Sequence, residues 1–133
     1  MRKIKFGSME LLGYTGMLLW MAVLLLRSRN LSDNTVYLFL LGILPNLAAA
    51  WTMTMFGKWF ILFVCKQRYT VKKHYILCLG IMILALLSEW IHDVFLNSPV
   101  DFYDILITLI AQLVLLFLPM LIKDKYFEGY PSK

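Results

Sequence analysis

The chain has 133 residues, of which 61% are hydrophobic and 16% are charged, and its formal net charge is +5. Soluble domains average ~45 to 50% apolar and ~25% charged residues, so this composition excludes an ordinary soluble domain. A helix needs roughly 20 mostly apolar residues to cross a membrane, so the length allows about four spans with short connections. The sequence therefore predicts an all-α membrane protein with a single domain, residues 1–133, built as a small bundle of four transmembrane helices.

The first predicted span covers residues 9–26, MELLGYTGMLLWMAVLLL, whose only charge is Glu10 at its margin. A cleaved signal peptide is the rival interpretation, because basic residues within the first five positions would form its positive N-terminal region. The apolar run is too long for a signal peptide, and the basic segment 27–29 follows it where small residues would mark a cleavage site. We therefore expect a genuine span.

The second apolar run, residues 36–65, is longer than one span. As a continuous helix its 30 residues would extend about 45 Å, more than the ~30 Å hydrocarbon core of a bilayer. Pro45 removes a backbone donor and would kink a helix, and the segment 57–59 is typical of an exit at the membrane interface. We expect a span over residues 36–56, with the sequence WFILFVC lying along or re-entering the cytoplasmic surface.

The third and fourth spans are predicted over residues 75–92 and 104–122, because both are long apolar runs. Gln112 is the strongest polar group in the fourth span. Pro99 forbids a straight helix through the connection, and the sequence Asn-Ser-Pro that ends there is typical of a turn. The two spans are therefore expected to form an antiparallel hairpin.

The basic residues predict the orientation, because they accumulate on the cytoplasmic side of short loops. Ten of them flank span ends that would share one side: Arg2, Lys3, Lys5, Lys66, Arg68, Lys72, Lys73, Lys123, Lys125 and Lys133. Arg27 and Arg29 fall on the opposite side, and Lys58 joins the basic side if the second span ends near Phe56. Both termini are therefore predicted to be cytoplasmic, with the acidic segment 88–104 on the outer face.

This distribution explains the net charge without a nucleic acid, and no nucleic-acid-binding motif accompanies it. Basic loops beside spans also attract anionic headgroups, so membrane lipids are expected partners. Cys65 and Cys78 approach the cytoplasmic side in this topology, where a reducing environment favours free thiols over a disulfide. The small residues Ala48–Ala50 indicate a close contact between helices.

The segment SEWIHDVFLNSPVDFYD, residues 88–104, concentrates titratable side chains beside the membrane: Glu89, His92, Asp93, Asp101 and Asp104. On a helix the first three stand at i, i+3 and i+4, so they share one face. Asp101 is typical of an N-cap, and Asp104 would occupy the third helical position, where a carboxylate complements the positive helix end. Capping and solvation at helix ends therefore form a complete structural interpretation of these residues.

Two functional interpretations use the same residues. Carboxylates and an imidazole are ligands for a divalent metal, and the candidate ligands are Glu89, His92, Asp101 and Asp104. Alternatively, neighbouring acids favour protonation of one another and His92 exchanges protons near neutral pH, which would make the segment a proton-linked site. Either interpretation requires the two short segments to fold back so that the carboxylates converge. No cofactor other than such a metal is expected.

The same residues resemble the signature of the VanZ-like family, small bacterial membrane proteins associated with teicoplanin resistance. That signature is a glutamate, a glutamine three residues later, a short loop that often contains arginine, and an Asp-x-x-Asp pair. Asparagine and glycine follow, four and seven residues beyond the second aspartate. Glu89, Asp101 and Asp104 fall at matching positions, and LGILPN, residues 41–46, loosely resembles the start of the family's second span.

The chain departs from this signature at several positions. His92 replaces the glutamine, Thr108 the asparagine and Ala111 the glycine, and the loop has no arginine, which argues against a matching anion or lipid-phosphate site. The resemblance is specific over residues 88–111 and topological elsewhere. It identifies the chain as a divergent VanZ-like protein. This resemblance implies a place in the bacterial cytoplasmic membrane and a role in how the cell envelope meets glycopeptide antibiotics, but no transferable reaction.

Three functions follow as hypotheses, of which a non-enzymatic one is favoured. The first is a non-catalytic envelope protein whose acidic outer site binds a lipid-linked envelope precursor or other lipophilic ligand, or a partner protein. The second is a metal-dependent enzyme acting on a lipid-linked envelope substrate. The third is an accessory subunit of a larger membrane complex, as a homo- or hetero-oligomer, in which Thr108 and Gln112 hydrogen-bond between helices and the tail 126–130 docks.

Overall fold

The computed structural model describes residues 6–29, 31–97, 99–122 and 124. Its regular elements are α1 (Ser8–Arg29), α2 (Thr35–Trp59), the π-helical segment η1 (Phe60–Val64), α3 (Val71–Leu96) and α4 (Phe102–Leu121). The basic residues at positions 2, 3, 5, 123, 125 and 133, the middle residue of the predicted turn and the tail 126–130 lie outside the described residues.

Every regular element in these described ranges is helical, and four segments are long and apolar enough to cross a membrane: Ser8–Arg29, Thr35–Val64, Val71–Leu96 and Phe102–Leu121. Most of their large apolar side chains are exposed on the outside of the bundle. That pattern suits helices surrounded by lipid, because apolar side chains need no cover from protein there. The prediction of an all-α chain with four helices suited to span a membrane is confirmed.

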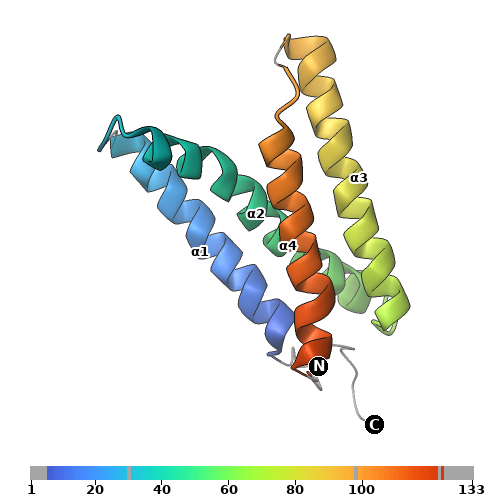
Figure 1. Ribbon diagram of the computed structural model, residues 1–133. Coiled ribbons are helices and arrows are strands. Elements are labelled where there is room, and N and C mark those ends of the chain that lie inside the picture. Colours follow the sequence, from blue (N-terminus) through green and yellow to red (C-terminus); the bar gives the residue numbers. More distant parts are fainter. Residues whose placement is uncertain (1–5, 30, 98, 123, 125–133) are drawn as a thin grey trace.

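The helices form two antiparallel pairs, α1 with α2 and α3 with α4 (Figure 1). α2 crosses behind α4 in this view to reach the start of α3, so α2 contacts all three other helices. The two pairs lie close together at the end where α1 begins, and they diverge toward the end where α4 begins. The predicted hairpin of the third and fourth spans is confirmed.

α1 and α2 approach closely because small residues line their contact. A Cβ atom placed on Gly16 would lie 2.7 Å from the Ala48 carbonyl oxygen and 2.8 Å from Thr52 Oγ1. Gly13 has as little space where it faces the side chain of Met55. The close helix contact predicted around Ala48 is confirmed, and glycines of α1 form its other half.

The helix that carries the second predicted span does not end at Phe56. The helix continues as α2 to Trp59 and then as η1 to Val64, so WFILFVC prolongs it instead of starting a separate surface segment. Lys58 explains the difference, because its side chain lies inside the bundle beside Glu10 and does not mark an exit to water. The proline inside α2 leaves the helix unbroken.

α3 and α4 are bounded by caps that the sequence supplies. The Thr70 side chain accepts a hydrogen bond from the Lys73 N–H at 3.4 Å, so α3 begins four residues earlier than the predicted span. Asn97 ends α3 with a left-handed backbone at φ 49°, a conformation that asparagine tolerates better than most residues. Asp101 caps α4 through a 2.9 Å hydrogen bond from the Tyr103 N–H, and this predicted N-cap is confirmed.

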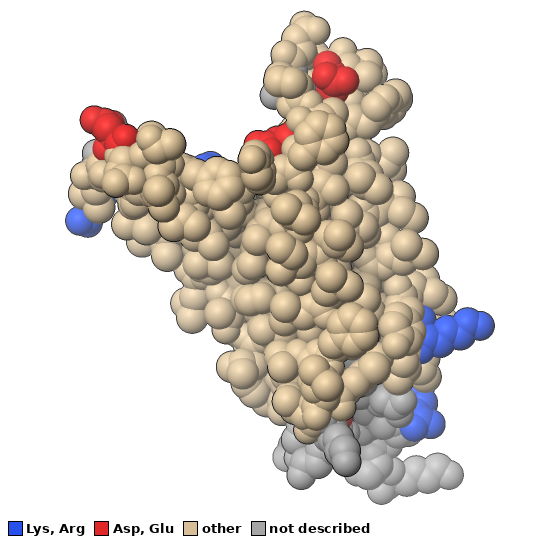
Figure 2. Space-filling model, viewed as in Figure 1, with Lys and Arg blue, Asp and Glu red and all other residues tan. Residues whose placement is uncertain are grey.

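The two ends of the bundle differ in charge (Figure 2). On the face shown, the acidic atoms lie at the end where the helix pairs diverge, together with some basic atoms, and the other basic atoms lie toward the opposite end. The backbone N–H and Oγ of Ser8 both donate to Asp124 Oδ2, at 2.5 and 2.6 Å. The start of α1 therefore meets a residue just beyond the end of α4.

Candidate functional site

The acidic segment is drawn together where α3 meets the start of α4. Glu89 Oε2 accepts a hydrogen bond from the Asp101 backbone N–H at 3.2 Å. Asp101 uses its own carboxylate to cap α4. Two residues separated by twelve positions in the sequence are thereby held at one helix start.

Asp104 lies where all four helices contribute a polar or charged group. Its carboxylate forms a side-chain hydrogen bond with Asn46 of α2, and the charges of Asp101, Glu89 and Arg27 act on it electrostatically. Arg27 belongs to the last turn of α1, and Asp104 to the first turn of α4. We call these five residues the acidic site. It unites three carboxylates, one amide and one guanidinium.

His92 and Asp93 do not enter the acidic site. Both are exposed on α3, and no side-chain hydrogen bond or ion pair joins them to another described residue. Sharing a helix face with Glu89 does not bring His92 and Asp93 to the acidic site. The reason is that α3 continues past Glu89 to Leu96, so its later turns lie beyond the start of α4.

The described candidate metal ligands are not brought together at this end. Among the described residues, no group of three or more His, Cys, Asp or Glu side chains is placed to hold one metal ion. Glu89 and Asp101 meet through a backbone N–H, and His92 lies apart from them. Metal binding by these residues therefore stays a prediction, and their geometry does not favour it.

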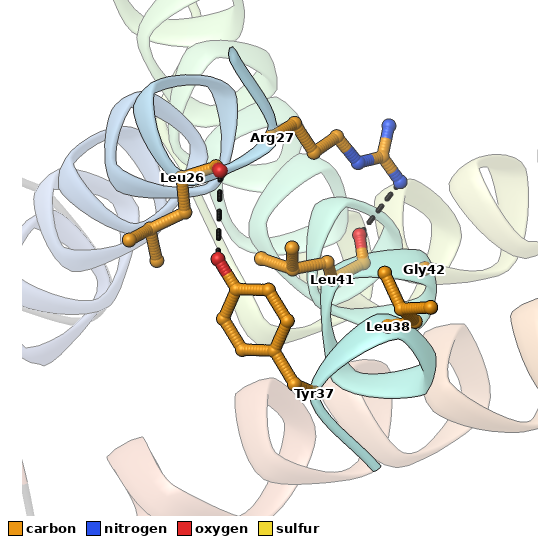
Figure 3. A pocket seen from close by; sticks show the side chains of 6 residues that line it. All are labelled: Leu26, Arg27, Tyr37, Leu38, Leu41 and Gly42. Carbon is orange, nitrogen blue, oxygen red and sulfur yellow. Dashed lines mark hydrogen bonds between the residues drawn. The ribbon is translucent and has the colours of Figure 1, made fainter. Parts of the chain in front are cut away.

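A pocket of about 160 Å³ opens between the facing ends of α1 and α2, and Arg27 belongs to both the pocket and the acidic site (Figure 3). Arg27 Nη2 donates a hydrogen bond to the Leu41 carbonyl oxygen at 2.6 Å. The Tyr37 hydroxyl donates to the Leu26 carbonyl oxygen at 3.4 Å. The remaining lining is Leu38 and Gly42, so the pocket combines one guanidinium with mainly apolar walls.

Thr108 and Gln112 lie buried on the face of α4 that also carries Asp104, and neither side chain bonds to another helix among the described residues. Thr108 Oγ1 donates to the Asp104 carbonyl oxygen within α4 at 2.8 Å. Gln112 is 3% exposed, and neither its amide nitrogen nor its oxygen has a partner among the described residues. A bond from Trp51 Nε1 to the Ala111 carbonyl oxygen, at 3.2 Å, joins α2 to α4 here.

Sequence reasoning missed a second polar cluster, which lies inside the opposite, basic end. Lys58 Nζ lies 2.8 Å from Glu10 Oε1, and the two side chains are 2% and 1% exposed. The Gly7 N–H donates to the other Glu10 carboxylate oxygen at 3.1 Å. Lys58 also stands over the Tyr69 ring, 5.7 Å from its centroid. A buried charge pair with additional partners thus ties α1 to α2.

Tyr69 and His74 extend this cluster toward α4. The Tyr69 hydroxyl lies 2.7 Å from His74 Nδ1, and His74 Nε2 lies 3.0 Å from the Leu115 carbonyl oxygen. A carbonyl oxygen only accepts, so Nε2 carries the proton and Nδ1 accepts from the hydroxyl. Burial, reinforced by Cys78 and Glu10, raises the pKa of Tyr69 well above its ordinary value. Tyr69 therefore stays a neutral donor.

The sequence contained a signal for part of this cluster. Apart from Arg27 and Arg29, Glu10 and Lys58 are the only formal charges in the first two candidate membrane spans, and the predicted topology places both at one end. Burying either charge alone is costly, so pairing is the expected solution. Cys65 and Cys78 are both free thiols, as predicted, with Cys65 exposed and Cys78 buried near His74.

No protein-family model, curated protein or solved structure matches the chain. The resemblance to VanZ-like proteins therefore rests on the sequence pattern alone, chiefly that of residues 88–111. The function is inferred below from the chemistry of the acidic site and the pocket beside it.

Proposed function

We propose that the protein is a VanZ-like, multi-pass protein of the bacterial cytoplasmic membrane that binds a lipid-linked or lipophilic ligand through a cationic group, without catalysing its conversion. The observation that carries the proposal is the acidic site. Its three carboxylates outnumber its one guanidinium, so it attracts a cation at the end of the bundle. An ammonium group is the cation that a membrane-embedded ligand would bring there.

Asp104 is the residue expected to contact the ammonium group. The carboxylate of Asp104 is half-buried and is held by Asn46, while Asp101 and Glu89 are committed to the turn between α3 and α4. A group fixed before binding loses little conformational freedom when the ligand arrives. Asp104 is therefore the main anchor of the proposed site, with Asn46 as its positioning residue.

The orientation in this proposal follows the distribution of basic residues. Lys66, Arg68, Lys72 and Lys73 lie in or beside the connection between η1 and α3, at the end where Ser8 meets Asp124. Basic connections favour the cytoplasmic side. Both termini are then cytoplasmic and the acidic site faces outward, where it would meet envelope precursors and lipophilic glycopeptide antibiotics.

The proposal is tested by titrating the detergent-purified protein with dodecylammonium, a lipophilic cation, and following tryptophan fluorescence. Trp90 adjoins Glu89 in the sequence and is exposed, so it can report binding at this end. Asp104→Asn should weaken binding by about tenfold or more, because a hydrogen bond to a charged group contributes roughly that factor. Asp93→Asn is the matched control and should bind as the wild type does. Equal affinities for the two variants would reject the acidic site.

The same proteins separate this proposal from a metal-dependent enzyme. Their melting temperatures are compared in EDTA and with added magnesium, calcium, manganese or zinc. A metal-specific rise in the wild type that is lost in both Asp104→Asn and Glu89→Gln would favour the enzyme. We expect no such rise, because the described carboxylates do not converge with His92.

A further inference from the structure

The pocket beside the acidic site indicates what else the ligand carries. Arg27 contributes to both features: it lines the pocket, and its charge acts on Asp104. The sequence has no arginine in the loop between the third and fourth spans, yet the fold brings a guanidinium to the acidic residues from α1. From this arrangement we propose that the site binds a zwitterionic lipid headgroup, with its phosphate on Arg27 and its ammonium group on Asp104. This inference rests on the proposed function and names its ligand class.

Arg27 has the capacity to hold a phosphate. Its guanidinium carries five N–H donors, and one of its nitrogens donates to the Leu41 carbonyl oxygen at 2.6 Å. That bond fixes the side chain at the pocket while other donors stay available for two phosphate oxygens in the fork geometry that arginine favours. The side chain is exposed overall, so the phosphate can reach it.

The walls of the pocket suit the apolar part of a lipid. Leucines from α1 and α2 line it together with Gly42, which adds no side chain. Arg27 lies in the last turn of the first membrane-crossing helix, where headgroup phosphates are found. Figure 2 shows that the molecule is hollowed at this end, between the diverging helix pairs, with acidic atoms on the floor of the hollow. A lipid could enter there from the side.

The balance of charges selects a zwitterion. A purely anionic headgroup on Arg27 would be repelled by the carboxylates of Glu89, Asp101 and Asp104. A simple ammonium ligand would bind the carboxylates, but it would bring no anion for Arg27. A phosphate and an ammonium group joined by a short linker satisfy both signs at once, so phosphatidylethanolamine has the required chemistry.

Gln112 is an independent sign that this side of α4 has hydrogen-bonding capacity left over. Its amide is buried, and neither end has a partner among the described residues. Gln112 lies on the same face as Asp104 and Thr108, and the Cα–Cβ bonds of a helix tilt toward its N-terminus, which is the acidic end of α4. Gln112 therefore lies about two helical turns from Asp104 along this face, and its buried amide has an unused donor and an unused acceptor among the described residues.

The test compares four probes on the full-length protein in a non-ionic detergent: phosphatidylethanolamine, phosphatidylglycerol with the same acyl chains, dodecylammonium and soluble phosphoethanolamine. Binding is measured by native mass spectrometry for the lipids and by tryptophan fluorescence for the soluble probes. The variants are Arg27→Gln and Asp104→Asn, with Arg29→Gln as the matched control, because Arg29 is an exposed arginine in the same helical turn. Melting temperatures establish that each variant is folded.

We expect phosphatidylethanolamine to bind the wild type at least about tenfold more tightly than phosphatidylglycerol, since one lost charged hydrogen bond corresponds to roughly that factor. Arg27→Gln should lose this preference while retaining dodecylammonium, and Arg29→Gln should change neither. Arg27→Lys should keep part of the preference, because it retains the charge and loses the fork geometry. Asp104→Asn should weaken both ligands.

Other results separate this inference from the function it rests on. Equal binding of the two phospholipids, or no effect of Arg27→Gln, would overturn the assignment of a zwitterionic ligand. If dodecylammonium binding still depends on Asp104 in that case, the proposed function stands. If no probe depends on Asp104, both fail. Phosphoethanolamine that binds as tightly as the lipid would show that the zwitterion is recognised without its acyl chains, which would overturn the lipid as its source.

Discussion

Lys58 Nζ of α2 lies 2.8 Å from Glu10 Oε1 of α1, and both side chains are almost fully buried inside the bundle. This pair joins the two helices at the basic end, while the acidic site occupies the opposite end. A charge pair at such depth is sensitive to the loss of one partner, because the remaining charge is left in an apolar surrounding.

Removing one member of this pair should be more harmful than removing both. Lys58→Met leaves Glu10 buried with an uncompensated charge, so we expect the free energy of unfolding to fall by about 3 to 5 kcal/mol. The double variant Glu10→Gln with Lys58→Met should recover most of that loss. Both are measured by denaturant unfolding in detergent micelles. Lys72→Met replaces an exposed lysine and serves as the control. A Lys58→Met protein as stable as the control would contradict the buried pair.

A methyl group at Gly16 should disturb the contact between α1 and α2. The new Cβ would meet the Ala48 backbone carbonyl at 2.7 Å, and backbone atoms cannot move aside as a side chain can. We expect Gly16→Ala to cost about 1 to 3 kcal/mol, the usual range for overpacking. The readout is the melting temperature.

Gly80→Ala is the matched control for that substitution. No heavy atom of the described residues, other than its own helix backbone and chain neighbours, lies within 4 Å of a Cβ at Gly80. Alanine should therefore stabilise α3 by about 0.5 to 1 kcal/mol through its higher helix propensity. If both alanine variants behave alike, the glycine-mediated contact is not what brings the helices together.

Tyr69 should make part of the stability depend on alkaline pH. Burial raises the pKa of Tyr69 above the value near 10 of an unfolded tyrosine, so its contribution is fully present below about pH 10 and is lost as the pH rises further. Tyr69→Phe removes the hydroxyl that bonds His74 and should cost about 0.5 to 1.5 kcal/mol at pH 8.

The difference between wild type and Tyr69→Phe should then shrink as the pH is raised from 8 to 11, because the wild type alone must keep this buried hydroxyl protonated. Unfolding free energies at several pH values measure it. Tyr14→Phe controls for an exposed tyrosine. A constant difference across this range would show that folding does not raise the pKa of Tyr69.

Replacing Gln112 should stabilise the protein. Both polar atoms of its amide lack partners among the described residues, and burying an unsatisfied amide costs roughly 1 to 3 kcal/mol. Gln112→Met keeps the shape and should raise the free energy of unfolding by about 1 kcal/mol or more. Gln67→Met, at an exposed residue bonded to Lys73, should be neutral or slightly destabilising. A loss of stability in Gln112→Met would mean that the amide is satisfied within the bundle.

The sequence by itself determined the class, the number of helices long and apolar enough to cross a membrane, and the start of α4. Hydropathy is a property of each segment alone, so long apolar runs predict spans without knowledge of their neighbours. Caps such as Asp101 accept hydrogen bonds from N–H groups two or three residues away, so the local sequence also predicts them. The hairpin of α3 and α4 follows from the short connection between them.

Tertiary structure decided which distant side chains meet. Arg27, Asn46 and Asp104 come from three helices, and Glu10 and Lys58 from two. In α1, α2 and α3 apolar side chains lie on nearly every side, so no periodic pattern marks the inward face. In α4 alone, polar residues such as Thr108 and Gln112 mark it. The rotation and crossing of the helices therefore set the contacts, and these depend on close packing at glycines such as Gly16, which no local rule predicts.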